Sequence, residues 1–146
     1  MSSISRRIVE INKPRRRQRG AAAVELAFIL PFLAVLIFGM VEFGVMFYDK
    51  AVITNASREG ARAGITGLGN AEIQQIVENY CNNNLVSLGG DSDFDPATDA
   101  NDTLTISMVG SNDLSVRLTY GYDLLFGSIF GFNSTTISAE TIMRME

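Results

Sequence analysis

Histidine is absent from this sequence of 146 residues, and cysteine occurs once, as Cys81. Without histidine, the chain lacks the side chain that most often acts as a general acid or base near neutral pH. A single cysteine excludes an intrachain disulfide. The sequence also lacks a nucleotide-binding glycine loop, and we expect no catalytic pair of carboxylates on a predicted rigid element. We therefore expect that the protein is not an enzyme and uses no cofactor.

Basic residues become scarce after position 19. Residues 1–19 contain seven of the twelve Lys and Arg residues and one Glu, whereas residues 20–146 contain five basic and fifteen acidic residues. Flanks rich in Lys and Arg stay on the cytoplasmic side of a membrane, so the C-terminal part is predicted to be extracytoplasmic. A basic segment can also bind nucleic acid. Because this basic segment lies directly beside an apolar helix, membrane topology explains its charge better than nucleic acid binding does. We therefore expect no nucleic acid partner.

A long hydrophobic run follows the basic segment. As a helix, residues 21–41 would be about 31 Å long, which matches the roughly 30 Å hydrocarbon core of a bilayer. Pro31 lies inside this run and should kink or loosen the helix. Apolar residues continue at helical spacing to about Ile65. The sequence thus predicts a transmembrane helix over residues 21–41 and its extracytoplasmic continuation over residues 42–66.

Small residues recur on one face of this continuation. Ala56, Gly60 and Gly64 are spaced four residues apart and form a smooth face that another backbone could approach closely. This face could pack on the protein's own sheet or on another subunit. The glycines at 67 and 69 end the helix.

The pattern of residues 67–146 predicts one small α+β domain. A second helix is expected from Asn70, as its N-cap, to about Asn84. Alternating residues predict strands over 104–109, 114–122 and 137–145, with a hairpin turn at 111–113. The apolar, glycine-containing residues 123–133 are expected to form a packed crossover. The expected fold is a small antiparallel sheet laid against the long helix.

An acidic loop is predicted over residues 89–102. Five of its aspartates have the spacing of ligands in a calcium-binding loop: Asp91, Asp93, Asp95, Asp99 and Asp102. Pro96 stands where that loop requires glycine, and no suitable helix leads into it. We expect a solvated loop without a metal, and calcium binding is the weaker alternative.

The junction between the basic segment and the apolar helix has a distinctive order of residues. Gly20 is a small residue at the boundary, Ala21 begins the apolar run, and Glu25 is the one carboxylate inside residues 21–41. A carboxylate within a membrane helix is costly, so it needs a reason. A basic leader, a small residue and a lone Glu at the fifth helical position together form the layout of a prepilin.

Residues 20–62 resemble the TadE-like family of pseudopilins, or minor pilins, from tight-adherence (Flp-type) type IV pilus systems. The resemblance rests on GAAAVE at 20–25, LP at 30–31, EFG at 42–44 and NASREGAR at 55–62. It implies a pilin-like fold, in which a long N-terminal helix carries the small domain. It also implies that residues 1–20 are a leader, removed between Gly20 and Ala21 by a prepilin peptidase.

The same resemblance implies a role in assembly or function of the pilus, and so in cell adhesion. Its implied partners are the prepilin peptidase, other pilins and pseudopilins, the inner-membrane assembly machinery and membrane lipid. The implied location is the bacterial inner membrane, with the N-terminus cytoplasmic and with incorporation into a pilus as an option.

Glu25 admits two interpretations. Cleavage would leave an ammonium group on Ala21, and Glu25 of one subunit could pair with that group on the next, fixing the axial register of assembly. Alternatively, Glu25 reaches the lipid headgroups, because it lies less than two turns from the edge of the bilayer. A different function is also open, that of an uncleaved, signal-anchored binding or sensor subunit with an acidic extracytoplasmic domain.

Overall fold

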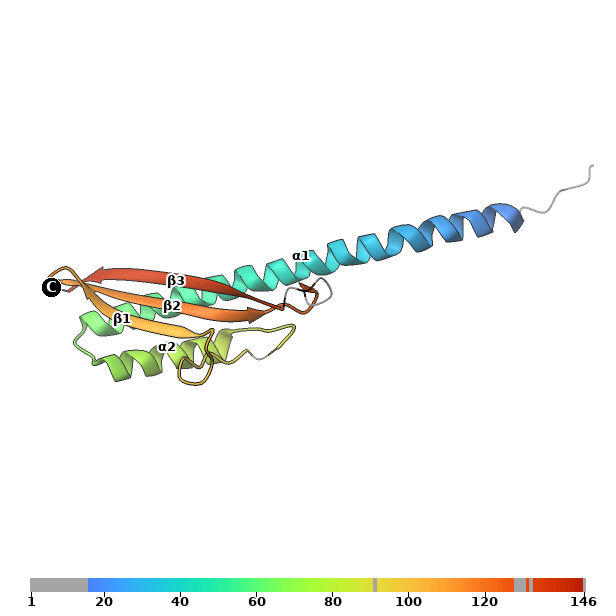
Figure 1. Ribbon diagram of the computed structural model, residues 1–146. Coiled ribbons are helices and arrows are strands. Elements are labelled where there is room, and N and C mark those ends of the chain that lie inside the picture. Colours follow the sequence, from blue (N-terminus) through green and yellow to red (C-terminus); the bar gives the residue numbers. More distant parts are fainter. Residues whose placement is uncertain (1–15, 91, 128–130, 132, 146) are drawn as a thin grey trace, which may run out of the picture. The chain divides into compact units, whose positions relative to one another are not determined.

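The computed structural model describes residues 16–90, 92–127, 131 and 133–145. Its elements are two helices, α1 (Arg16–Ile65) and α2 (Asn70–Asn84), and three strands, β1 (Thr103–Val109), β2 (Asp113–Asp123) and β3 (Ser134–Arg144) (Figure 1). The chain divides into two compact units, residues 1–36 and 37–146, and α1 contributes to both. This architecture confirms the expected α+β fold with a long N-terminal helix and a small antiparallel sheet.

The first unit contains the N-terminal portion of the apolar part of α1. Every residue from Gly20 to Leu33 is exposed, although most are hydrophobic, and the helix continues through Pro31 without interruption. Among the described residues, one helix is long and apolar enough to cross a membrane. A helix that is hydrophobic on all sides needs an apolar environment.

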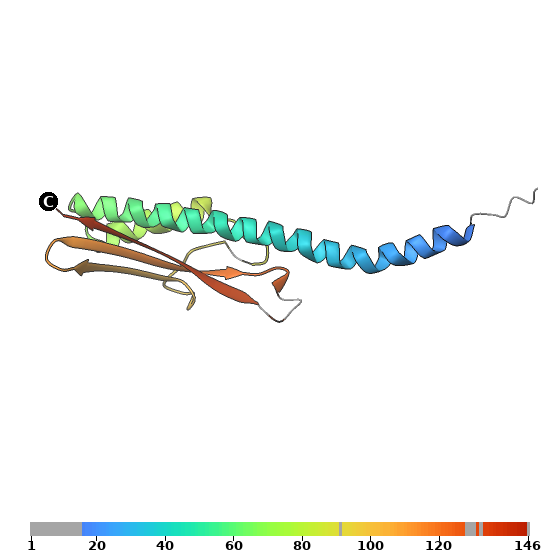
Figure 2. The same cartoon turned by 90° about the horizontal axis from the view of Figure 1, so that it is seen from above.

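The second unit consists of two layers. The C-terminal part of α1 and the whole of α2 form one layer, which covers one face of the sheet (Figure 2). Burial of apolar side chains between the layers drives this packing. The largest fully buried apolar side chains come from α1, α2, the loop after α2, and β2: Ile53, Ile73, Val77, Phe94, Val116, Leu118, Tyr120 and Tyr122.

The sheet has the order β1-β2-β3, with both pairs antiparallel. The central strand β2 alternates between inward residues such as Leu118 and outward residues such as Arg117. The β1–β2 hairpin closes at the pair Val109 and Asp113, and Gly110 has a positive φ of 73° that favours glycine. The predicted strands and this turn are confirmed to within a few residues.

The expected crossover after β2 is wrong. β3 lies directly beside β2, with Asp123 paired to Ser134, so the intervening segment connects two neighbouring antiparallel strands. Its apolar composition has another cause, because Leu124 packs against the core and the ring of Phe126 stacks on Phe38 of α1.

The N-cap of α2 is Gly69, one residue before the predicted Asn70. The carboxylate of Glu72 accepts a hydrogen bond from the Gly69 backbone N–H at 2.8 Å. This contact is one half of a capping box, and it needs no side chain at the N-cap position. Asn70 therefore occupies the first position of the helix.

The small-residue face of α1 lies against the chain's own domain. Ala56, Gly60 and Gly64 are all buried. A Cβ added at Gly60 would lie 2.7 Å from Cγ2 of Val77 on α2, and one added at Gly64 would overlap Leu114 on β2. The two glycines thus permit the close approach of α1 to both α2 and the sheet.

Gly60→Leu should destabilise the domain by about 1–3 kcal/mol, because a side chain at this position overpacks the contact with α2. Gly44→Leu is the matched control, since an added Cβ at Gly44 has no atom within 4 Å. Thermal unfolding of the purified protein in detergent, followed by circular dichroism, measures the difference. Equal melting temperatures for the two variants would contradict the assigned packing.

Candidate functional site

The residues predicted to form the cleavage and assembly site lie on one exposed stretch of α1. Gly20, Ala21 and Glu25 are all exposed, and an added Cβ at Gly20 would meet no atom within 4 Å. Ala21 and Glu25 are four residues apart in a continuous helix, so they share a face one turn apart. The arrangement leaves one exposed carboxylate in an otherwise apolar stretch of helix.

The bond between Gly20 and Ala21, the predicted cleavage position, lies inside α1 in this structure. α1 begins at Arg16, four residues before Gly20. Arg and Gln have high helix propensity, and a glycine inside a helix costs only about 1 kcal/mol relative to alanine. The helix therefore extends into the basic segment.

Glu42 is a second carboxylate on α1, and it is buried, with a relative exposure of 6%. Its Oε1 accepts hydrogen bonds from the backbone N–H groups of Leu125 and Phe126, the latter at 3.3 Å. Its Oε2 also lies 3.3 Å from the Phe126 nitrogen. Glu42 thus holds the segment that follows β2 against α1.

Asp49 lies two turns further along α1 and is fully buried. Its Oδ1 accepts a hydrogen bond of 3.0 Å from the Val86 N–H, just beyond α2, while its Oδ2 has no partner among the described residues. Burial raises the pKa of Asp49 to about 6, against the lowering effect of the Val86 hydrogen bond. Asp49 thus fixes the end of α2 to α1, with part of its carboxylate unsatisfied.

Tyr122 completes this buried acidic cluster from β2. Its side chain is fully buried, and its hydroxyl has no hydrogen-bond partner in the described part of the chain. Burial, followed by the charges of Glu42 and Asp49, raises the pKa of Tyr122 to about 12. Sequence reasoning missed this cluster. The available signal was the seven-residue spacing of Glu42 and Asp49, which places both on one face of a largely apolar helix.

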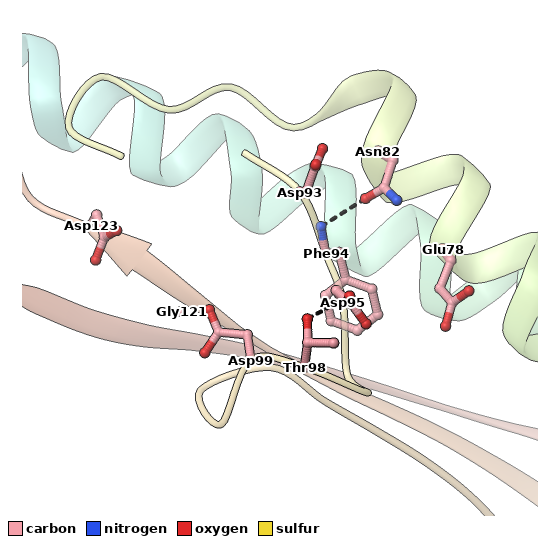
Figure 3. A pocket seen from close by; sticks show the side chains of 9 residues that line it. All are labelled: Glu78, Asn82, Asp93, Phe94, Asp95, Thr98, Asp99, Gly121 and Asp123. Carbon is pink, nitrogen blue, oxygen red and sulfur yellow. Dashed lines mark hydrogen bonds between the residues drawn. The ribbon is translucent and has the colours of Figure 1, made fainter. Parts of the chain in front are cut away.

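An acidic cleft of about 610 Å³ lies between α2, the loop that follows it, and the end of β2 (Figure 3). Asn82 on α2 anchors one wall, because its Oδ1 accepts a 2.7 Å hydrogen bond from the N–H of the buried Phe94. The lining side chains are mostly acidic or polar: Glu78, Asn82, Asp93, Phe94, Asp95, Thr98, Asp99 and Asp123, with Gly121 completing the wall.

Two of the candidate calcium ligands, Asp95 and Asp99, accept hydrogen bonds from groups within the loop. Asp95 accepts hydrogen bonds from the Thr98 hydroxyl at 2.6 Å and the Ala97 N–H at 3.0 Å, which hold its pKa below the usual value. Asp99 accepts a bond from the Asn101 N–H at 2.8 Å. These contacts are local turns that need no ion.

Asp102 is buried and bridges the loop to the sheet. It accepts hydrogen bonds from the Asp95 N–H at 3.0 Å and the Gly121 N–H at 2.8 Å, while burial raises its pKa. Asp93 is exposed, and Asp91 lies outside the described residues. Within the described ranges, no group of three or more acidic or cysteine side chains could hold a metal ion.

Cys81 lies on the inner face of α2 and is fully buried. Burial, together with the nearby charges of Asp102 and Glu78, raises the pKa of its thiol to about 12. A thiol in this environment remains protonated and unreactive at neutral pH. Its place is in the hydrophobic core.

A comparison with protein families matches residues 20–62 to the family described as TadE-like protein. This match confirms the resemblance over the segment on which it rests. Searches of curated proteins and of solved structures gave no match for this chain.

Asp49→Asn should make the stability of the domain less dependent on pH. Because the pKa of Asp49 is raised from 3.8 to about 6, the folded state binds this proton more tightly than the unfolded state. The stability that this proton contributes is fully present below about pH 4 and is lost as the pH rises through about 6. The variant should therefore gain stability relative to the wild type over this interval, while its amide oxygen still accepts from Val86.

Melting temperatures of both proteins, measured between about pH 4 and pH 7, test this expectation. Glu59→Gln, which changes an exposed carboxylate on the same helix, is the control. A difference between Asp49→Asn and the wild type that stays constant across the interval would contradict the assignment.

Proposed function

We propose that this chain, whose residues 20–62 match the TadE-like family, acts as a minor pilin or pseudopilin of a tight-adherence pilus. The observation that carries the proposal is the N-terminal half of α1. It is an exposed apolar helix with one carboxylate, Glu25, one turn after the predicted new N-terminus. Such a helix can be held by lipid before assembly and by neighbouring subunits afterwards. The proposed role is structural rather than catalytic.

In this proposal the protein is a single-pass protein of the bacterial inner membrane. The asymmetry of Lys and Arg across residues 21–41 keeps the N-terminus in the cytoplasm and places residues 42–146 outside. The prepilin peptidase would cut after Gly20, and other pilins and the assembly machinery would receive the processed subunit.

Glu25 would act by pairing with the Ala21 ammonium of a neighbouring subunit. Among the described residues, Glu25 has neither a hydrogen bond nor an ion pair, and it is exposed. Two opposite charges that meet between packed apolar helices offset the cost of placing either one there alone. Because the pairing needs a defined axial position, it would also fix the offset between neighbouring subunits.

The acidic cleft favours a second candidate function, an uncleaved signal-anchored subunit that binds a basic partner. Its five lining carboxylates come from α2, the following loop and β2: Glu78, Asp93, Asp95, Asp99 and Asp123. Sequencing of the N-terminus of the membrane-extracted protein separates the candidates, because only a processed pilin would begin at Ala21.

Gly20→Ile should block processing, because the bulky side chain fills the small-residue position beside the scissile bond. The variant should accumulate as a species larger by the 20-residue leader, still inserted in the membrane, since the charge asymmetry and the apolar run are unchanged. Immunoblotting of membrane fractions measures the shift. Gly39→Ile, the same change within the same helix, should be processed normally, and normal processing of Gly20→Ile would refute the assigned cleavage site.

Glu25→Ala should insert and be processed but should not assemble. Removing the carboxylate makes insertion into lipid easier. It also leaves the Ala21 ammonium of a neighbour unpaired among packed helices, at a cost of about 3–5 kcal/mol if that group is buried. Glu25→Gln should fail in the same way, because an uncharged amide does not neutralise an ammonium group.

Assembly is measured as piliation and surface adherence of cells that express each variant. The amount of processed protein in the inner membrane is measured in the same cells. Glu59→Gln, an exposed carboxylate on the domain half of α1, should assemble normally. Normal piliation by both Glu25 variants would show that Glu25 only reaches the headgroups.

A further inference from the structure

The uncharged surface of α1 extends beyond residues 21–41. Between Leu26 and Tyr48 the helix contains one charged residue, Glu42, and the chain's own residues 125 and 126 cover its carboxylate. Phe43, Phe47 and Tyr48 are 60%, 68% and 50% exposed. Asp49 is buried, so the helix presents no uncovered charge to its surroundings between Leu26 and Lys50.

This length reaches through the hydrocarbon core and the outer headgroup region. Residues 21–41 would be about 31 Å long as a helix, against a core of roughly 30 Å, and residues 42–48 would add about 10 Å, against roughly 5–8 Å for one headgroup region. Aromatic residues such as those at 43, 47 and 48 are enriched at the membrane–water interface. If residues 21–41 span the membrane, the helix leaves the outer headgroup region near Tyr48.

The segment after β2 contacts α1 at a position inside the predicted span, before the point where the helix leaves the bilayer. The ring of Phe126 stacks on that of Phe38, with centroids 4.4 Å apart and planes 10° apart. Phe38 precedes Tyr48 by ten residues, or about 15 Å along the helix axis. Phe126 is therefore held at the depth of the last turn of the predicted span, and the neighbouring Leu125 side chain is 42% exposed.

The backbone N–H groups of this segment have hydrogen-bond partners within the chain, as an environment without water requires. The N–H of Leu124 donates to the Asn133 carbonyl at 3.0 Å, and the N–H groups of Leu125 and Phe126 donate to the Glu42 carboxylate. Three consecutive donors outside a helix or strand thus have partners within the chain. Non-helical backbone at membrane depth requires such internal partners.

We propose that residues 124–127 form a membrane-inserted tip, which binds the boundary between headgroups and acyl chains of the outer leaflet. The partner is the lipid surface itself. Leu125 and Phe126 insert into this surface beside α1, and the Glu42 carboxylate accepts the hydrogen bonds of their backbone N–H groups. This inference rests on the proposed transmembrane function of residues 21–41. It assigns the domain a second membrane contact, which seats it against the bilayer before it joins a pilus.

The absence of tryptophan from the sequence allows a direct test with one tryptophan at a time. Leu125→Trp places the probe in the tip, Phe32→Trp in the middle of the span, and Met108→Trp near the hairpin at the opposite end of β2. Each full-length variant is reconstituted into phosphatidylcholine–phosphatidylglycerol vesicles. Part of the lipid is brominated either near the headgroup or near the end of the acyl chain.

For Leu125→Trp we expect blue-shifted emission that lipid brominated near the headgroup quenches at least twofold more than lipid brominated at the chain end. Phe32→Trp should show the reverse preference, and Met108→Trp should be quenched by neither. Phe126→Trp, which retains an aromatic ring against Phe38, serves as a second tip variant and should behave as Leu125→Trp does.

Two results would overturn the inference while leaving the span intact. In both, Phe32→Trp is quenched and the tip variants are not. Red-shifted emission would then mean that the tip lies in water, and blue-shifted emission would mean that protein, such as a second copy of this chain, covers it. Loss of quenching at Phe32→Trp as well would refute the transmembrane assignment, and the inference with it.

The role of Glu42 is tested in the Leu125→Trp background. Glu42→Ala removes the acceptors of two N–H groups, so quenching by the headgroup-brominated lipid should fall at least twofold. Glu42→Gln keeps an amide oxygen in the same place and should retain most of the quenching. Equal quenching in both variants would contradict the part assigned to Glu42.

Discussion

The structure depends on one helix, α1, whose two parts lie in different environments. From Gly20 to Leu33, α1 is exposed on all sides and largely apolar, whereas its C-terminal part buries one face against α2 and the sheet. A core built from apolar contacts alone would hold these elements together, but such contacts are not directional. The close fit at Gly60 and Gly64 supplies part of the missing specificity, because only a smooth helix face admits Val77 and Leu114 at this distance.

Buried carboxylates supply the rest. Glu42 and Asp49 lie two turns apart on α1 and accept hydrogen bonds from main-chain N–H groups beyond the ends of β2 and α2. A hydrogen bond has a defined length and direction, so each carboxylate fixes one connecting segment along the helix axis. Burial of Asp49 is costly, as its raised pKa indicates, and its second oxygen is unsatisfied. Such a cost is consistent with a group retained for positioning rather than for stability.

The sequence predicts the regular elements of this fold because their causes are local. The alternation in β2 and the glycines after Ile65 act over a few residues, and the expected elements agree with the structure to within a few positions. The errors arise where contacts between residues that are distant in the sequence determine the structure. The partners of Glu42 lie 83 and 84 residues away, and that of Asp49 lies 37 residues away, so no spacing in the sequence reveals them.

The aspartates of the acidic loop are a second example of what residue spacing does not reveal. Their spacing suggests a shared ligand, yet Asp95, Asp99 and Asp102 each bind backbone N–H groups nearby or across the loop. A pattern of ligand residues does not by itself indicate a site, because aspartate also favours turns for its ability to accept such bonds. Whether a carboxylate is available for a ligand depends on how many backbone donors the fold leaves unpaired around it.

The same criterion separates the two glutamates of the apolar part of α1. Glu42 is covered, and both of its oxygens already accept hydrogen bonds from its own chain. Glu25 is exposed in a helix that is otherwise apolar around it, and the described residues provide it with no donor. An unpaired carboxylate in an apolar setting favours any arrangement that brings a cation to it. Of the two, only Glu25 has oxygens without a partner among the described residues, so the proposed coupling to a neighbouring helix is assigned to Glu25 and not to Glu42.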